Sequence, residues 1–89
     1  MPETTVERVI RVIAATQHYA ADKAATLTAE STFEQLGIDS LDGINIVFAL
    51  ENEFNVNIPD EDAKNIKSIQ DIAGGIDRLL AARAPEQAG

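Results

Sequence analysis

One short junction, residues 36–41, constrains the fold of this chain more than any other stretch of its sequence. Gly37 can adopt a positive φ, which ends any helix that precedes it. Asp39 can accept the free backbone N–H groups of a helix that begins with Ser40. The junction therefore predicts a helix over residues 40–55, with a serine on its first turn at the positive end of the helix dipole.

The apolar residues of this helix fall on two faces when successive residues are placed about 100° apart. The expected core face consists of Ile46, Val47, Leu50 and Phe54. A second apolar stripe consists of Leu41, Ile44 and Phe48. One helix in so small a domain is not expected to bury both stripes fully. Part of the second stripe should then face water below Ser40 as an acid-rimmed docking surface. The alternative is a wider core face that the preceding loop covers.

A first helix is predicted over residues 5–18, because Thr4 and Glu7 match a capping box and apolar residues follow at helical spacing. Residues 20–39 form a long connection, with one turn expected at residues 33–36. The expected anchors of this connection in the core are Leu27, Phe33, Leu36 and Ile38.

Two more helices are predicted after an irregular bridge at residues 55–58. Pro59 suits the first turn of a short helix that ends near Asn65. Ser68 then caps a last helix, with Asp71 as the carboxylate at its third position.

The expected fold class is all-α, a small four-helix bundle of three main helices and one short helix. A single domain covers residues 1–89, with residues 4–82 expected to be ordered and residues 83–89 to form a flexible tail. Gly74 and Gly75, inside the last helix, indicate either a close helix contact or a soft spot.

Composition excludes several kinds of chemistry. The chain has no cysteine, and therefore no disulfide framework and no cysteine nucleophile or metal ligand. Its one histidine, His18, has no catalytic or metal-binding partner nearby in sequence. The acids at Asp39 and Asp42 lack the alternate spacing of a calcium loop. We therefore expect no enzymatic activity, no catalytic residue and no metal site.

The charge of the chain is strongly negative, at −8, and no Lys or Arg lies between Lys23 and Lys64. Such a balance repels nucleic acid and anionic membranes and steers basic partners toward the protein, although a merely solubilising surface is the alternative. Neither a signal-type N-terminus nor a membrane-spanning stretch is found. We expect a cytoplasmic monomer that does not insert into membranes.

Three segments of the chain resemble the acyl carrier proteins, and the resemblance covers roughly residues 4–80. These segments are Phe33–Asp42, Leu50–Phe54 and Ile58–Asp62. The most specific part is residues 37–41, in register with Phe54 and with the pair Ile58 and Pro59.

By this resemblance, Ser40 is the attachment site of a 4′-phosphopantetheine arm, which a phosphopantetheinyl transferase (holo-acyl-carrier-protein synthase) donates from coenzyme A. The thiol of the arm holds acyl groups as thioesters. The implied partners are ketosynthases, acyltransferases and other acyl-processing enzymes with basic docking patches, in fatty acid, specialised lipid or polyketide-type biosynthesis. Family members also shelter acyl chains between their helices, which implies the same here.

The resemblance also implies a partner-binding face on the helix that follows Ser40. The positions of this face are Asp39, Leu41, Asp42, Ile44, Asn45, Phe48, Glu51 and Asn52. Carriers of fatty acid synthesis typically have acids where Asn45 and Asn52 stand and methionine where Phe48 stands. Each asparagine removes a charge and weakens steering toward Arg- and Lys-rich synthases. These departures indicate a specialised carrier that serves a dedicated pathway.

Two other classes of function stay open. A peptidyl or aryl carrier domain shares the attachment serine, but it usually has Gly-Gly before His/Asp-Ser, where this chain has Gly37, Ile38 and Asp39. It is also usually less acidic. The second alternative is an unmodified acidic helical module that binds basic proteins.

Overall fold

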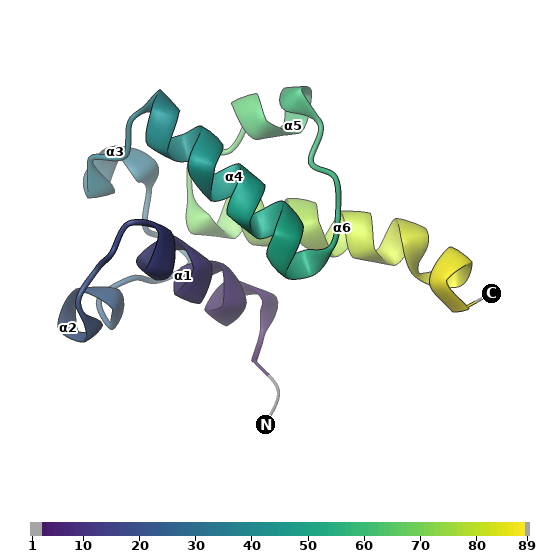
Figure 1. Ribbon diagram of the computed structural model, residues 1–89, viewed down its shortest axis with the longest axis horizontal. Coiled ribbons are helices and arrows are strands. Elements are labelled where there is room, and N and C mark those ends of the chain that lie inside the picture. The colour runs from purple at the N-terminus through teal and green to yellow at the C-terminus, as the bar shows by residue number, and fades with distance from the viewer. Residues whose placement is uncertain (1–2, 89) are drawn as a thin grey trace.

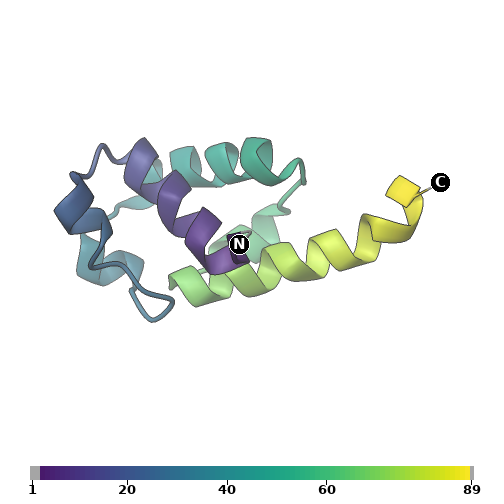
Figure 2. The same ribbon diagram turned by 90° about the horizontal axis from the view of Figure 1, so that it is seen from below.

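The computed structural model describes residues 3–88, and it describes side chains for residues 3–82. Three long helices dominate this part of the chain: α1 (Thr5–Thr16), α4 (Ser40–Phe54) and α6 (Ile69–Ala88). Three short helices connect them: α2 (Ala21–Ala24), α3 (Phe33–Leu36) and α5 (Asp60–Lys64). The two ribbon views agree that α1 packs against both α4 and α6 (Figures 1 and 2). Over the described residues, every helix is too short or too polar to span a bilayer.

The core between the long helices is almost entirely aliphatic. Its buried members are Val9, Val12, Ile13, Leu27, Ile46, Leu50, Phe54, Ile58, Ile69, Ile72, Ala73 and Ile76. The all-α class and the three main helices are confirmed. The number of short helices was wrong, because the long connection before the junction contains two of them, α2 and α3.

The predicted start of α1 is confirmed and its predicted end was wrong. The Thr4 hydroxyl accepts the Glu7 N–H at 3.1 Å, and the Glu7 carboxylate accepts the Thr4 N–H at 2.8 Å. The helix ends at Thr16 rather than His18 because His18 adopts a left-handed φ of 57°. The chain then turns away from the helix axis.

The connection between α1 and α4 is anchored in the core as predicted. Leu27 is buried, and Phe33, Leu36 and Ile38 pack partly buried against the core. The turn at residues 33–36 is the helix α3. In contrast, α2 was missed, because its four residues are too few to show an apolar period.

The last two helices are set by their caps. Pro59 lies at the N-cap of α5, one residue before the predicted place, because its carbonyl already accepts the Ala63 N–H at 3.0 Å. Ser68 and Asp71 form the predicted cap of α6. The Ser68 hydroxyl accepts the Asp71 N–H at 3.2 Å, and the Asp71 carboxylate accepts the Ser68 N–H at 3.3 Å. The backbone of α6 is helical to Ala88. The side chains of residues 83–88 and all of Gly89 lie outside the described part, and the flexible tail stays a prediction.

The glycine pair in α6 does not serve a close helix contact. A Cβ built on Gly74 meets no heavy atom within 4 Å, and one on Gly75 meets only the Arg78 guanidinium at 3.9 Å. The soft-spot interpretation is therefore favoured.

Replacing Gly74 with alanine is expected to raise the free energy of unfolding by about 1 kcal/mol, because alanine restricts the unfolded chain and fills open space. Urea denaturation measures the change. Gly37→Ala is the matched control: Gly37 has a φ of +70°, and alanine there should lower the stability. A loss of stability in Gly74→Ala would contradict the open surroundings of this glycine.

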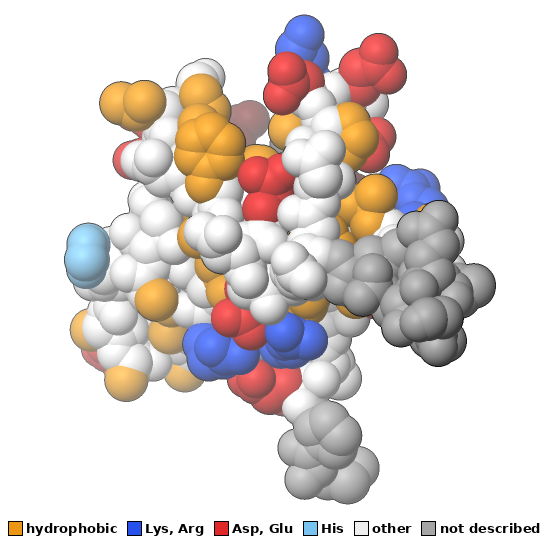
Figure 3. Space-filling model, turned by 45° about the vertical axis from the view of Figure 1, so that its right-hand side comes forward, with side chains coloured by type: hydrophobic (Ala, Val, Ile, Leu, Met, Phe, Trp, Pro, Cys, Tyr) orange, Lys and Arg blue, Asp and Glu red, His pale blue; other side chains and the backbone are white. Residues whose placement is uncertain are grey.

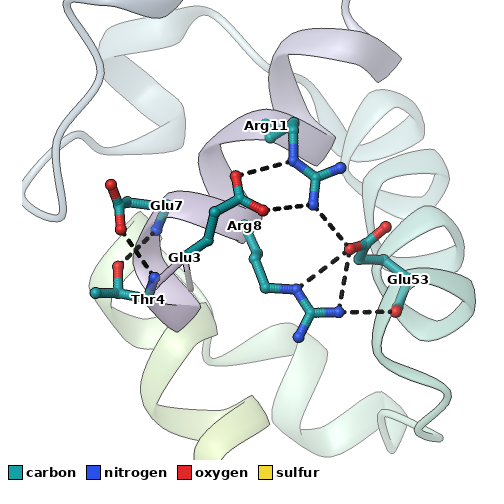
Figure 4. Close-up of polar contacts among 6 residues, drawn as sticks. All are labelled: Glu3, Thr4, Glu7, Arg8, Arg11 and Glu53. Carbon is teal, nitrogen blue, oxygen red and sulfur yellow. Dashed lines mark hydrogen bonds and ion pairs between the residues drawn. The ribbon is translucent and has the colours of Figure 1, made fainter. Parts of the chain in front are cut away.

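A cluster of ion pairs fastens the C-terminal end of α4 to α1 (Figure 4). The Glu53 carboxylate lies 3.1 Å from the Arg8 guanidinium and 3.0 Å from that of Arg11. Arg11 also pairs with Glu3 at 2.9 Å. The Arg8 guanidinium stands over the ring of Phe54, 4.2 Å from its centroid. Hydrogen bonds from Arg8, and then from Arg11, hold the pKa of Glu53 below its ordinary value.

Glu53→Gln is expected to lower the thermal unfolding midpoint at neutral pH, and the gap to the wild type should close in acid. The pKa of Glu53 in the folded protein lies below that of a glutamate in the unfolded chain. As the pH falls, the unfolded state is therefore protonated first. The stability that the Glu53 charge contributes is thus fully present above the ordinary glutamate pKa of about 4.3. It is lost as the pH falls through the pKa of Glu53 in the folded protein. Melting curves across this range test it, with exposed Glu30→Gln as control. A gap that is independent of pH would contradict this role of the charge.

Candidate functional site

Ser40 is the first residue of α4, and its side chain is exposed. Among the described residues, its hydroxyl has no hydrogen-bond partner. Directly before it, Asp39 has extended backbone and caps the helix, because its carboxylate accepts the Asp42 N–H at 2.8 Å. The serine therefore presents an unengaged nucleophilic oxygen at the start of a helix.

The local sequence explains why the chain places Ser40 here. Gly37 takes the left-handed conformation predicted for it and ends α3, with its N–H bonded to the Glu34 carbonyl at 3.1 Å. The Ile38 N–H donates a hydrogen bond to the Phe33 carbonyl at 3.0 Å, and the Ile38 side chain packs against the core. With both sides of the junction fixed, the helix begins at Ser40.

The start of α4 can accommodate a phosphate ester. Backbone N–H groups at a helix N-terminus point outward, and the helix dipole favours a negative charge there. The exposed Ser40 hydroxyl leaves room for a covalent arm that extends into solvent. The residues present thus fit the attachment of a phosphate-linked group.

The second apolar stripe of α4 is exposed, as predicted. Leu41 is 68% exposed, Ile44 51% and Phe48 59%. Figure 3 shows hydrophobic side chains exposed in the upper part of the view, with acidic side chains beside them. The alternative of a wider core face was wrong, because the preceding loop is anchored through α3 and Ile38 on the core side of α4. We call Leu41, Ile44 and Phe48 the apolar strip.

The other residues assigned to the partner-binding face differ in their surroundings. Asn45 and Asn52 are exposed, and Asp42 is half-buried. The carboxylate of Glu51 is half-buried and accepts the Ile58 N–H at 2.7 Å, which holds the loop after α4. Sequence reasoning missed this contact because it spans seven residues and matches no helix or turn motif.

A groove opens between α5 and α6, with a volume of about 430 Å³. Its polar lining is Asp62, Asn65, Gln70, Asp71 and Arg78. Its hydrophobic lining is Ile58, Ile66, Ile72, Ile76 and Leu79. The glycine pair of α6 also lines it. His18 is exposed at the end of α1, and among the described residues no group of three potential ligands could hold a metal ion.

Comparison with protein families finds one model that matches residues 7–76, the family described as "Phosphopantetheine attachment site". Ser40 lies inside the matched range. A solved structure, the acyl carrier protein of Thermotoga maritima, superposes with a TM-score of 0.64 at 31% sequence identity. The match covers 83% of this chain and 92% of that one, and supports the all-α fold described above.

Among curated proteins, the chain is 35% identical over 82 residues to the acyl carrier protein of Thermosynechococcus vestitus, covering 92% of this chain and all of that protein. It is 45% identical over 76 residues to acyl carrier protein 4, chloroplastic, of Arabidopsis thaliana, covering 85% of this chain and 54% of that protein. The chain spans only a little more than half the length of the plant relatives that it matches.

Proposed function

Because this chain belongs to the acyl carrier protein family, we propose that it carries acyl groups as thioesters on a 4′-phosphopantetheine arm attached to Ser40. The observation that carries the proposal is the exposed, unengaged hydroxyl of Ser40 at the start of α4, within the residues that the family model matches. The peptidyl or aryl carrier alternative is less well supported, because the relatives named above are acyl carrier proteins.

In attachment, the chain acts as a substrate of a phosphopantetheinyl transferase. The Ser40 oxygen gives up its proton to the transferase and attacks the phosphorus that carries the pantetheine in coenzyme A. The pyrophosphate P–O bond breaks, and adenosine 3′,5′-bisphosphate leaves. The dipole of α4 favours the negative charge of the phosphodiester at the start of the helix. When bound, the arm supplies the thiol that the cysteine-free chain lacks. The chain itself performs no bond chemistry on the acyl group.

Partner enzymes are proposed to dock beside Ser40 on the apolar strip and its neighbours. The net charge of −8 favours partners with basic patches through long-range steering. The isoleucines and Leu79 that line one part of the groove between α5 and α6 offer apolar contacts to an acyl chain. The proposal that the chain works in the cytoplasm stays a prediction, since its relatives include chloroplastic and mitochondrial proteins.

We further propose a specialised pathway, such as an unusual lipid or a secondary metabolite. Asn45 and Asn52 add no charge to the docking face, and Phe48 adds a rigid aromatic anchor. Turnover by the ketosynthase of ordinary fatty acid synthesis tests this proposal. Full activity there would count against specialisation.

The carrier function is tested by intact-mass measurement. The chain is incubated with coenzyme A, Mg²⁺ and a broad-specificity phosphopantetheinyl transferase. The expected result is a gain of one phosphopantetheine, which peptide mapping locates to the segment that contains Ser40. An unchanged mass would favour the alternative of an unmodified acidic module.

A further inference from the structure

The groove between α5 and α6 has two kinds of lining. Its apolar side chains come from four isoleucines and Leu79. Five exposed polar residues also line it: Asp62, Asn65, Gln70, Asp71 and Arg78. Pockets that bind small molecules typically combine apolar surface with a few polar groups that fix the orientation of the ligand, in volumes of about 300–1,000 Å³. At about 430 Å³, this groove has the size and the mixed lining of such a pocket.

Arg78 is the cation of the lining, and its guanidinium is available for a ligand. In the part of the chain that the structure describes, this group makes no ion pair and no hydrogen bond. Its side chain leans back along α6, so that a Cβ built on Gly75 would lie 3.9 Å from the guanidinium. Gly74 and Gly75 add no side chain to the groove that they line. A donor with unengaged N–H groups therefore lies over a bare stretch of α6.

The same lining provides hydrogen-bond acceptors. The side chains of Asp62 and Gln70 make no hydrogen bond with another described residue. Asn65 donates its amide N–H to the Glu61 carbonyl at 3.1 Å, which leaves its side-chain oxygen unengaged. Asp71 differs, because its carboxylate is engaged in the cap of α6. A ligand in this groove thus meets donors and acceptors as well as apolar surface.

We propose that the groove receives the acyl group of the arm on Ser40, and that this acyl group carries uncharged oxygens, as hydroxyl or keto groups. A plain hydrocarbon chain would gain contacts with the isoleucines, but it would cover polar groups without bonding them, which is unfavourable. A hydroxyl or keto oxygen can accept hydrogen bonds from Arg78, and a hydroxyl can also donate to Asp62 or Gln70. An anionic acyl group fits less well, because the lining has two carboxylates and one guanidinium.

This inference rests on the proposed function, because the acyl group reaches the groove through the arm on Ser40. The test loads the chain with octanoyl, 3-hydroxyoctanoyl or 3-oxooctanoyl groups, by supplying the transferase with the corresponding coenzyme A thioesters. Intact mass verifies each loading. At least one oxygenated group is expected to raise the thermal unfolding midpoint about 4 °C more than octanoyl does, the effect of one hydrogen bond to a charged group. The same group should shift the amide resonances of Gly74 and Gly75.

Arg78→Met tests the role of the guanidinium. Methionine keeps an unbranched apolar side chain and removes every N–H donor. The advantage of the oxygenated group over octanoyl is expected to fall to about 1 °C or less. Lys64→Met is the matched control, since it removes the same charge from α5 at an exposed residue outside the groove lining, and it should keep the full advantage. Both side chains are exposed, and melting of the unloaded variants checks that they fold.

Three results would overturn the inference while the carrier function stands. They are equal midpoints for the octanoyl and oxygenated forms, an advantage that Arg78→Met retains, and an advantage that Lys64→Met loses. An unchanged mass after every loading reaction is a different failure, because it removes the proposed function itself. An advantage that Arg78→Met removes and Lys64→Met keeps, with shifts at Gly74 and Gly75, supports the inference.

Discussion

Complete loss of the phosphopantetheine mass gain is the expected result of Ser40→Ala. A methyl group has no oxygen to form the phosphodiester. The fold should not change, because alanine is a good residue on the first turn of a helix and Asp39 still caps α4. Intact-mass spectra of the wild type and the variant, treated side by side with transferase and coenzyme A, measure the effect.

The chain provides a matched control, since it has two other serines. Ser31→Ala removes a hydroxyl that accepts the Thr28 N–H at 2.9 Å, and should keep the full mass gain. A gain that persists in Ser40→Ala would show that another side chain accepts the arm, and the assignment of the site would have to be abandoned.

Leu50→Ala is expected to cause a large loss of stability. Leu50 is completely buried against the core. Removing a buried leucine side chain costs about 2–5 kcal/mol, from lost burial and from the cavity that remains. A domain of this size is stable by roughly 5–10 kcal/mol, so a large share of the total would be lost.

Urea denaturation measures this loss, and the control lies two residues away. Phe48→Ala removes an even larger side chain from the same helix, but one that is mostly exposed, and should change the free energy of unfolding by about 0.5 kcal/mol or less. If the two truncations cost similar amounts, the division of α4 into a core face and an exposed strip would be wrong.

The contrast between these neighbours shows which parts of the fold could be predicted from sequence. Leu50 and Phe48 were assigned to opposite faces by the helical period alone, and the structure confirms both. The helix caps could also be predicted from sequence, because the two partners of each cap are three residues apart: Thr4 with Glu7, and Ser68 with Asp71. Local geometry that one turn of helix fixes can be recognised without knowledge of the tertiary structure.

Contacts between distant segments could not be predicted in this way. Arg8 and Glu53 are 45 residues apart, and nothing local to either indicates the pairing. The same holds for Glu51: the resemblance places it on a partner-binding face, whereas its carboxylate contacts the backbone of the next loop. At the site itself, the position of Ser40 on the first turn of α4 and the exposure of part of the second apolar stripe were predicted. Their roles in attachment and docking stay a proposal.

The two ends of α4 are held very differently. Its buried residues, Ile46, Leu50 and Phe54, all lie beyond its first turn, and the arginine contacts of Glu53 add to the same end. The opening segment, residues 40–45, includes Gly43 and buries no side chain. Local unfolding should therefore start beside Ser40 and stop at Ile46. The turn that bears the nucleophile is therefore expected to exchange its amide hydrogens faster than residues 46–54, while the rest of the domain stays folded.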